Sequence, residues 1–247
     1  MGDPGCFVPV VFAVVTPVVA VTDSTMRRAS GSVLAANRPC LKTRPIRMSK
    51  QHTEYTIRAS YSEHTVRVYQ AYRPEIAKPA LEAGRFVPPF KIDRMTWIKP
   101  SFNWMMYRSG YASKPGQEFV LGVDITREGF EWALQHAALS SYQPGFHASH
   151  EDWKRNLEAK PVRIQWDPER DWRLQLIGDV RAIQIGLSGE AVERYVNQWI
   201  VRIEDVTPVA HMVAAAVKSG IPPSPLPSAS ERPYPLDAAI AAAICPY

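Results

Sequence analysis

All seven tryptophans of this 247-residue chain fall between Trp97 and Trp199, and this clustering limits where a packed core can form. Tryptophan buries a large apolar area, so its distribution marks the compact part of a chain. The sequence therefore predicts a single folded domain over residues 48–210. It also predicts an N-terminal extension at 1–47, either disordered or foreign to the native protein, and a Pro/Ala-rich C-terminal tail at 211–247.

Charge separates the same parts of the chain. Residues 1–47 hold six Lys or Arg and two acids, out of 29 bases and 24 acids in the whole chain, which leaves 23 bases and 22 acids for the remainder. The basic balance therefore comes from the N-terminal extension. The folded part is close to neutral, which weakens any argument from charge alone that it binds nucleic acid.

An apolar run from Phe7 to Thr22 is interrupted by Pro9 and Pro17. It is shorter than the roughly 20 residues that a membrane-spanning helix needs. No positive charge precedes it, as one would in a secretory signal. We therefore expect no signal, no membrane partner and a cytoplasmic or nuclear location, and we expect residues 1–47 to be dispensable for folding.

Residue periodicity predicts a mixture of strands and helices. Alternation of β-branched and aromatic residues predicts strands near 66–72, 96–99, 118–125, 162–166 and 183–187. Helical spacing predicts helices at 74–83, after Ser101, around 130–137 and across 192–206. Asp167-Pro168 predicts a turn, and the Pro-rich stretch 221–235 predicts an extended, mobile tail. Without a regular β-α-β alternation, the pattern indicates an α+β fold with one mixed, strongly bent sheet packed by helices.

The segment 94–110 interleaves aromatic rings with fixed cations. Such a run is suited to holding a flat, anionic ligand. Lys99 also precedes Pro100 and Ser101 at a predicted helix start, where free backbone N–H groups attract anions. In the alternative interpretation Ser101 only caps the helix and Lys99 is solvated. The candidate binding residues are Arg94, Trp97, Lys99, Trp104, Tyr107 and Arg108.

Polar side chains on predicted strands form a second group of candidates. Gln70, Gln165 and Gln184 could line one polar pocket or belong to hydrogen-bond networks within the core. Asp167, together with Glu169 and Asp171, is either a salt-bridged turn or a source of a catalytic acid. The chain has no phosphate-binding loop, nucleophile elbow or Cys/His pair at a known spacing. His and Cys lack the spacing of metal ligands, so no metal site is expected.

Several of these segments together resemble one protein family. The segments are Ile57-Arg58-Ala59, Val68 to Tyr72, Arg94 to Gly110, Val162 to Arg170 and Ile183 to Leu187. They resemble the domain-of-unknown-function 4291 family over about residues 50–210. This resemblance implies a start near Met48 but no particular activity.

The order of elements also resembles the small ADP-ribosyltransferase-like domains. That resemblance implies an enzyme with NAD as its cofactor, in which Gln70 and Ser101 orient the ribose and amide. Arg94, Lys99 and Arg108 would then meet phosphates, and Trp97, Trp104 or Tyr107 would stack on a ring. A single-stranded RNA-binding module and a non-catalytic interaction domain are the alternatives. In every case the expected partner is a nucleotide-like or other anionic molecule, or a nucleic acid, and the sequence leaves the oligomeric state open.

Overall fold

The computed structural model describes residues 54–246, so the expectations for residues 1–47 lie outside the described range. The strands are β1 (Glu54–Tyr55), β2 (Arg58–Ala59), β3 (Thr65–Tyr72), β4 (Thr96–Ile98), β5 (Phe119–Thr126), β6 (Ala137–Leu139), β7 (Val162–Arg170), β8 (Leu176–Leu187), β9 (Ile200–Asp205) and β10 (Arg232–Pro233). The α-helices are α1 (Pro74–Ala83), α2 (Phe102–Ser109), α3 (Arg127–Gln135), α4 (His150–Ala159), α5 (Glu190–Arg194), α6 (Thr207–Ser219) and α7 (Ala238–Ile244). A π-helix, η1 (Tyr195–Trp199), continues α5, and a 3-10 helix, η2 (Pro227–Ser230), precedes β10.

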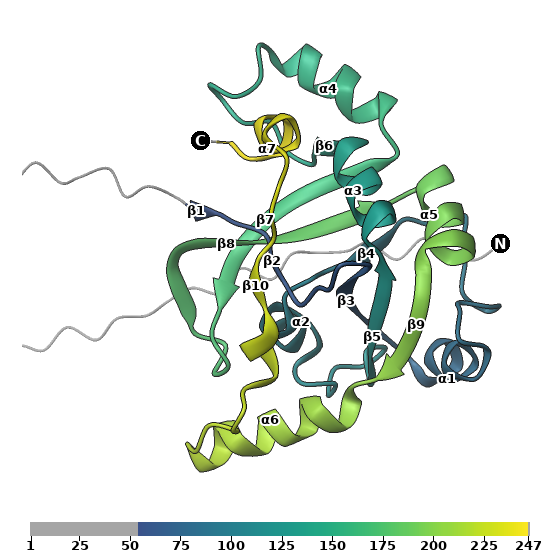
Figure 1. Cartoon of the computed structure of the whole chain (residues 1–247), viewed down its shortest axis with the longest axis vertical. Helices are drawn as coiled ribbons and strands as arrows, with labels where there is room; N and C mark the ends of the chain where they lie inside the picture. Colours follow the sequence, from purple (N-terminus) through teal and green to yellow (C-terminus); the bar gives the residue numbers. More distant parts are fainter. Residues whose placement is uncertain (1–53, 247) are drawn as a thin grey trace, which may run out of the picture. The chain divides into compact units, whose positions relative to one another are not determined.

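Two sheets meet at one backbone bridge and form the expected bent sheet. The first has the order β3-β5-β9 and is antiparallel. In the second, β8 pairs with β7 along one edge and with β4 and β1 along the other, and β6 pairs with β7. An isolated antiparallel bridge between Tyr69 and Lys99 joins β3 to the end of β4. In Figure 1, β8 runs across the view while β5 and β9 run down it. The α+β prediction with a strongly bent sheet is confirmed.

Side-chain alternation gives the domain two apolar clusters. The larger includes Val66 and Val68 of β3 together with residues of α1, α3, α5 and α7. The smaller includes Tyr69 of β3 together with residues of α2 and α6. Because successive side chains of a strand point to opposite faces, β3 contributes to both clusters. This strand is therefore buried on both sides, and the polar residues within it, Arg67 and Gln70, lie close to the core.

The predicted helix over 192–206 is wrong in its second half. The helical backbone ends with η1 at Trp199, and Ile200–Asp205 forms β9, which pairs with β5. The spacing of the apolar residues from Ile200 to Ile203 is compatible with a helix and also with a strand. Pairing with the free edge of β5 satisfies its backbone groups in a way that an isolated helix extension would not.

The predicted turn at Asp167-Pro168 is also wrong, because β7 continues through Arg170. Proline lacks the N–H that a strand ladder needs, so within sheets it is found at edges and bulges. The register of β7 against β8 shifts between Pro168 and Arg170. This irregularity accommodates the proline without ending the strand, and it leaves Asp167 within the sheet.

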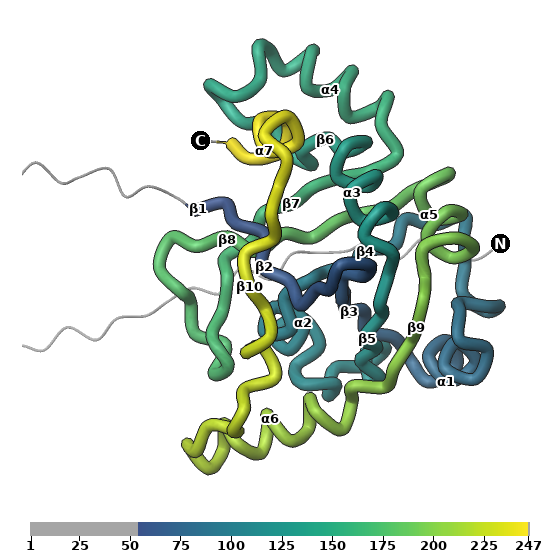
Figure 2. Tube along the Cα trace, in the orientation of Figure 1, coloured from purple at the N-terminus to yellow at the C-terminus, as the bar shows by residue number. Residues whose placement is uncertain are grey.

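The segment after residue 210 differs most from the sequence prediction. It continues the domain, since α6 is buried at Ala210 and Val213, and β10 pairs antiparallel with β2. The yellow tube in Figure 2 runs from α6 past β2 to α7 beside β6. Ile240 and Ile244 of α7 are buried in the larger cluster. The proline-rich stretch between these contacts is extended, and it crosses the domain surface instead of forming a free tail.

Candidate functional site

The second sheet has one apolar and one polar face, and the polar face forms the floor of a cavity. Ile98 of β4, Ile164 of β7 and Ile185 of β8 point into the larger apolar cluster. Their neighbours along the strands point the other way. These neighbours are Trp97, Lys99, Gln165, Gln184 and Gly186. Arg108 and Met105 of α2 and the loop at 115–117 complete a cavity of about 600 Å³, which we call the Lys99 pocket.

Lys99 is the most perturbed side chain in this pocket. It is only 5% exposed, and its Nζ lies 4.3 Å from the centroid of the Trp104 ring. Among the described residues its ammonium group has no hydrogen-bond acceptor or ion pair. Burial and the nearby charge of Arg108 lower the pKa of Lys99 from 10.5 to about 7, and the charge of Asp167 opposes this only in part. An anion entering the pocket would supply the missing partner.

Trp97 forms a flat wall of the same pocket. It lies opposite Gly186 in the β4–β8 register, and a Cβ added at Gly186 would lie 2.9 Å from the indole ring. Glycine at this position therefore lets the ring rest against the backbone of β8. The arrangement offers a planar aromatic surface beside two cations, Lys99 and Arg108.

Gln165 of β7 and Gln184 of β8 are paired across the two strands, and both donate to the same carboxylate. Nε2 of Gln165 donates to Oδ1 of Asp167 at 2.8 Å, and Nε2 of Gln184 donates to Oδ2 of the same residue. The predicted grouping of these two amides is thus present, although it fixes Asp167 as well as lining the pocket. Asp167 is the acidic residue that acts electrostatically on Lys99.

Gln70 is a buried part of the pocket wall and has a full set of internal partners. Its Oε1 accepts from the hydroxyl of Tyr195 at 2.7 Å. Its Nε2 lies 2.7 Å from Oγ1 of Thr96 and 3.1 Å from the carbonyl oxygen of Trp97. The hydroxyl of Tyr72 completes the network. Because the amide is saturated by the protein, the network holds β3 against β4 and fixes the backbone on which Trp97 and Lys99 stand.

Ser101 caps α2, and carboxyl groups of the protein occupy the positive end of that helix. Oγ of Ser101 accepts from the backbone N of Trp104 at 3.2 Å and donates to Oε1 of Glu169 at 3.0 Å. The backbone N of Phe102 donates to Oε1 of Glu231 at 2.7 Å. The helix start therefore holds a carboxyl group of the C-terminal segment. Ser101 does not line the Lys99 pocket.

Glu231 and Glu169 are two neighbouring buried carboxyl groups. Burial, together with the charge of Glu169, raises the pKa of Glu231 to about 8 against the lowering effects of the Phe102 N–H and the charge of Arg58. Burial likewise raises the pKa of Glu169. Glu231 lies far from α2 in the sequence, and no local signal predicts that it caps this helix.

The remaining aromatic and cationic residues of segment 94–110 differ in their surroundings. Trp104 is buried beneath Lys99. Tyr107 is half-exposed, and the guanidinium carbon of Arg170 lies 3.6 Å from its ring centroid. Arg108 lines the Lys99 pocket. Arg94 lines an adjoining cavity of about 360 Å³, which we call the Arg94 pocket.

The two pockets adjoin along a common wall and together form what we call the basic groove. They share Tyr72, Met95, Thr96 and Gly116. Five cations line the groove, namely Arg73, Lys91, Arg94, Lys99 and Arg108. No Asp or Glu is among the described residues that line it. Sequence reasoning missed Arg73 and Lys91, although Lys91 precedes the aromatic–cation run by only three residues.

Within residues 54–246, no three His, Cys, Asp or Glu side chains gather closely enough to hold a metal ion. None of the helices in this range combines the length and the apolar composition needed to cross a bilayer.

Comparison with known proteins gives a family. No curated protein matches the chain. The family model described as Domain of unknown function (DUF4291) matches residues 56–234. The matched span includes β10, so it agrees with a domain that extends past residue 210. Because the match covers well over half of the sequence, the chain belongs to the DUF4291 family.

Proposed function

We propose that the basic groove binds an elongated, phosphorylated ligand of the dinucleotide type, with NAD as the leading candidate. The observation that carries this proposal is the lining of two adjoining cavities by five cations and no carboxylate. A ligand with several anionic groups in a row would satisfy these charges. The volumes of the two cavities fall within the range of small-molecule sites.

Each part of the groove has a role in this proposal. Lys99 and Arg108 contact one phosphate and Arg94 contacts the next, while Trp97 stacks on a base or on nicotinamide. Trp104 supports Lys99 from below. Gln70 and Ser101 act indirectly, since Gln70 holds the wall and Ser101 caps the helix that carries Arg108.

The finer part of the proposal is an enzyme of the ADP-ribosyltransferase-like class. Such an enzyme breaks the bond between nicotinamide and ribose and transfers ADP-ribose to an acceptor or to water. Asp167 lies behind the two glutamine amides that line the Lys99 pocket, so it would act on positive charge at the ribose only through space and not by contact. Release of nicotinamide from NAD, followed by mass spectrometry, tests this step, and Asp167→Asn should slow it while NAD still binds.

Calorimetric titration with NAD and ADP-ribose tests the binding proposal. Binding should raise the pKa of Lys99 above its free value of about 7, so at pH 8 complex formation should take up a proton. The pyrophosphate of these ligands does not titrate near neutral pH, so Lys99 would be the source of the signal. The enthalpy should therefore vary with the ionisation enthalpy of the buffer, and affinity should fall as the pH rises above 7.

Variants make this test specific. Charge-assisted contacts imply that Lys99→Met and Arg108→Gln each weaken binding by roughly 10- to 100-fold. Proton uptake should vanish in Lys99→Met and persist in Arg108→Gln. Lys154→Gln is the matched control, because Lys154 is 66% exposed and lies outside the groove. Absence of binding by both ligands would refute the proposal.

Salt dependence separates this proposal from the RNA-binding alternative. Single-stranded RNA would place successive phosphates along the same cations, and each contact adds about 0.7 to the slope of log affinity against log salt. A short oligonucleotide that binds more tightly than NAD, with a steep slope reduced by Arg94→Gln, would favour the RNA-binding function.

A further inference from the structure

A second cavity of about 510 Å³ lies beside the other face of β3. We call it the Tyr69 pocket. It shares no lining residue with the basic groove. Arg67 and Tyr69 line it, two residues apart on one face of the strand, whereas Gln70 and Tyr72 of the opposite face line the groove. Pro227 and Ser230 of η2 close one side, so the C-terminal crossing forms part of its wall.

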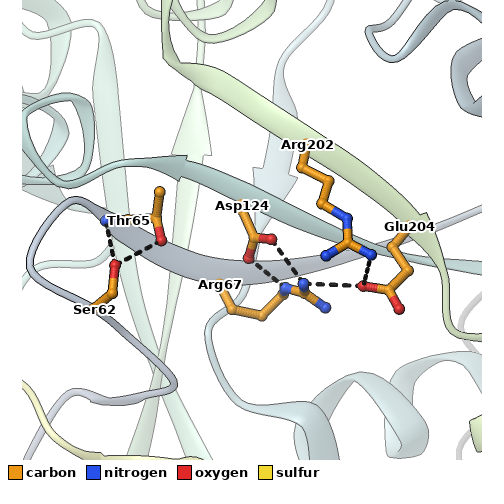
Figure 3. Close-up of polar contacts among 6 residues, drawn as sticks. All are labelled: Ser62, Thr65, Arg67, Asp124, Arg202 and Glu204. Carbon is orange, nitrogen blue, oxygen red and sulfur yellow. Dashed lines mark hydrogen bonds and ion pairs between the residues drawn. The ribbon is translucent and has the colours of Figure 1, made fainter.

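Arg67 is held in the Tyr69 pocket by two carboxylates (Figure 3). Its Nε lies 2.5 Å from Oδ1 of Asp124, and its Nη2 lies 2.7 Å from Oδ2 of Asp124 and 3.1 Å from Oε2 of Glu204. Its remaining nitrogen, Nη1, lies over Gly122, where an added Cβ would be 2.6 Å away. Among the described residues, Nη1 has no hydrogen-bond acceptor. The guanidinium is therefore fixed in place with one donor edge left over.

The hydroxyl of Tyr69 is a second unused donor in this pocket, beside that of Arg67. The side chain is only 6% exposed, and its ring packs edge-on against Phe102 with centroids 5.5 Å apart. Within the described residues its hydroxyl has no hydrogen-bond partner. The hydroxyl is not among the buried polar atoms that lack a partner, so it is open to the cavity that Tyr69 lines. Two fixed donors thus meet at one cavity without an acceptor.

The charges of the pocket indicate what kind of acceptor fits. Asp124 and Glu204 outnumber Arg67 among its lining residues, so a phosphate or carboxylate would meet net repulsion. A cationic amine would have to compete with Arg67 for both oxygens of Asp124, and with Arg67 and Arg202 for Oε2 of Glu204. The groups that remain are the two unused donors and the hydroxyls of Ser60 and Ser230, while those of Ser62 and Thr65 lie 3.0 Å apart and hydrogen-bond to each other. This set suits a neutral ligand rich in hydroxyl groups.

We propose that the Tyr69 pocket binds a neutral polyhydroxylated ring, a pentose or hexose. A ring or hydroxyl oxygen of the sugar accepts from Nη1 of Arg67 and from the hydroxyl of Tyr69. Its other hydroxyls contact the two remaining serine side chains, and its C–H face packs against Phe102 and Val206. The inference does not rest on the basic groove, because the two sites have separate linings.

Saturation-transfer NMR with ribose, glucose and inositol, using the full chain, tests this assignment. Wild type should bind at least one neutral sugar. Tyr69→Phe, which removes only the hydroxyl, should weaken binding roughly fivefold through loss of one hydrogen bond. The same variant should not lower the melting temperature, since in the free protein that hydroxyl has no partner to lose. Ser230→Ala, which removes a lining hydroxyl on the C-terminal crossing, should also weaken binding.

Controls distinguish this site from the groove. Lys99→Met should leave sugar binding unchanged even though it weakens NAD binding. Protonated glucosamine should bind less well than glucose, and ribose 5-phosphate in the Lys99→Met background less well than ribose. The assignment is overturned if no neutral sugar binds, if Tyr69→Phe binds as well as wild type, or if the charged analogues bind more tightly.

Discussion

The main chains of Tyr69 and Lys99 exchange both hydrogen bonds of a single antiparallel bridge, with N···O distances of 2.7 and 3.3 Å. Through this bridge the two sheets become one bent surface. The same two residues line different cavities, since Tyr69 lines the Tyr69 pocket and Lys99 lines the Lys99 pocket. A shift of the bridge would therefore move both candidate sites together.

The first prediction concerns the pH dependence of stability at Lys99. Its pKa is about 7 in the folded protein and 10.5 when unperturbed, so the unfolded chain holds more protons between these values. The destabilising effect of the buried charge is full below pH 7 and disappears as the pH rises towards 10.5. Each pKa unit is worth about 1.4 kcal/mol. Relative to Lys99→Met, wild type should gain several kcal/mol across this window.

Urea denaturation of both proteins at pH 6.5, 8 and 9.5 measures this difference. Lys154→Met is the control, since its exposed side chain should give a difference that does not vary with pH. A constant gap between wild type and Lys99→Met would contradict the low pKa of Lys99.

The second prediction concerns Glu231 and has the opposite sign. Its pKa of about 8 in the folded protein exceeds its ordinary value of 4.5, so ionisation destabilises the fold as the pH rises from 4.5 through 8. Glu231→Gln keeps an oxygen acceptor for the Phe102 N–H and does not ionise. The variant should therefore become more stable relative to wild type between pH 5 and 9.

Two substitutions serve as comparisons for Glu231→Gln. Glu231→Ala should destabilise at every pH by about 1–3 kcal/mol, because it leaves the buried Phe102 N–H without an acceptor. Glu193→Gln, on the exposed side of α5, should show little change. Denaturation curves in which Glu231→Gln tracks wild type at all pH values would disprove the buried-carboxylate account.

The third prediction reverses a general rule about helices. Replacing a helical glycine with alanine usually stabilises a protein by roughly 0.5–1 kcal/mol. At Gly129 in α3, the added Cβ would lie 2.3 Å from Cγ of Trp199. Gly129→Ala should therefore destabilise by about 1–3 kcal/mol through overpacking. Chemical denaturation measures this, and the cost should shrink in a Trp199→Leu background; stabilisation in the wild-type background would refute the contact.

The fourth prediction tests whether the C-terminal segment belongs to the core. Ile240 of α7 is 7% exposed, so Ile240→Ala should cost about 2–5 kcal/mol by removing buried methyl groups and leaving a cavity. Ala242→Ser, at an exposed position of the same helix, should be close to neutral. Equal stability of the two variants, measured by urea denaturation, would indicate a free tail.

Local signals explain which parts of the fold can be predicted from the sequence. Helix α1 begins at Pro74 and ends before Gly84, which has a φ of 65°, and both residues favour those positions for steric reasons. β9 is mispredicted because the spacing of its apolar residues suits both a helix and a strand. Pairing with the edge of β5 decides in favour of the strand. Propensity alone does not reveal such a partner.

The candidate site likewise has a part that local sequence predicts and a part that depends on residues distant in the sequence. Trp97, Lys99 and Arg108 are close in the sequence, and a strand followed by a helix brings them to one cavity. Arg73, which lines the groove, and Glu231, which caps α2, come from distant segments and become neighbours only in the folded chain. The convergence of Arg67 and Tyr69 on the Tyr69 pocket depends likewise on Asp124, Glu204 and η2.

The late position of β10 in the chain affects how the protein folds during synthesis. Arg58 of β2 donates to the carbonyl of Glu231, a contact across 173 residues. A ribosome must release nearly the whole domain before this contact, the cap of α2 and the wall of the Tyr69 pocket can form. Until then the apolar surface that α7 covers is open to other molecules. Contacts of such long range slow folding, so we expect the last step on the ribosome, rather than the formation of β3 and α2, to be where this chain depends most on chaperones.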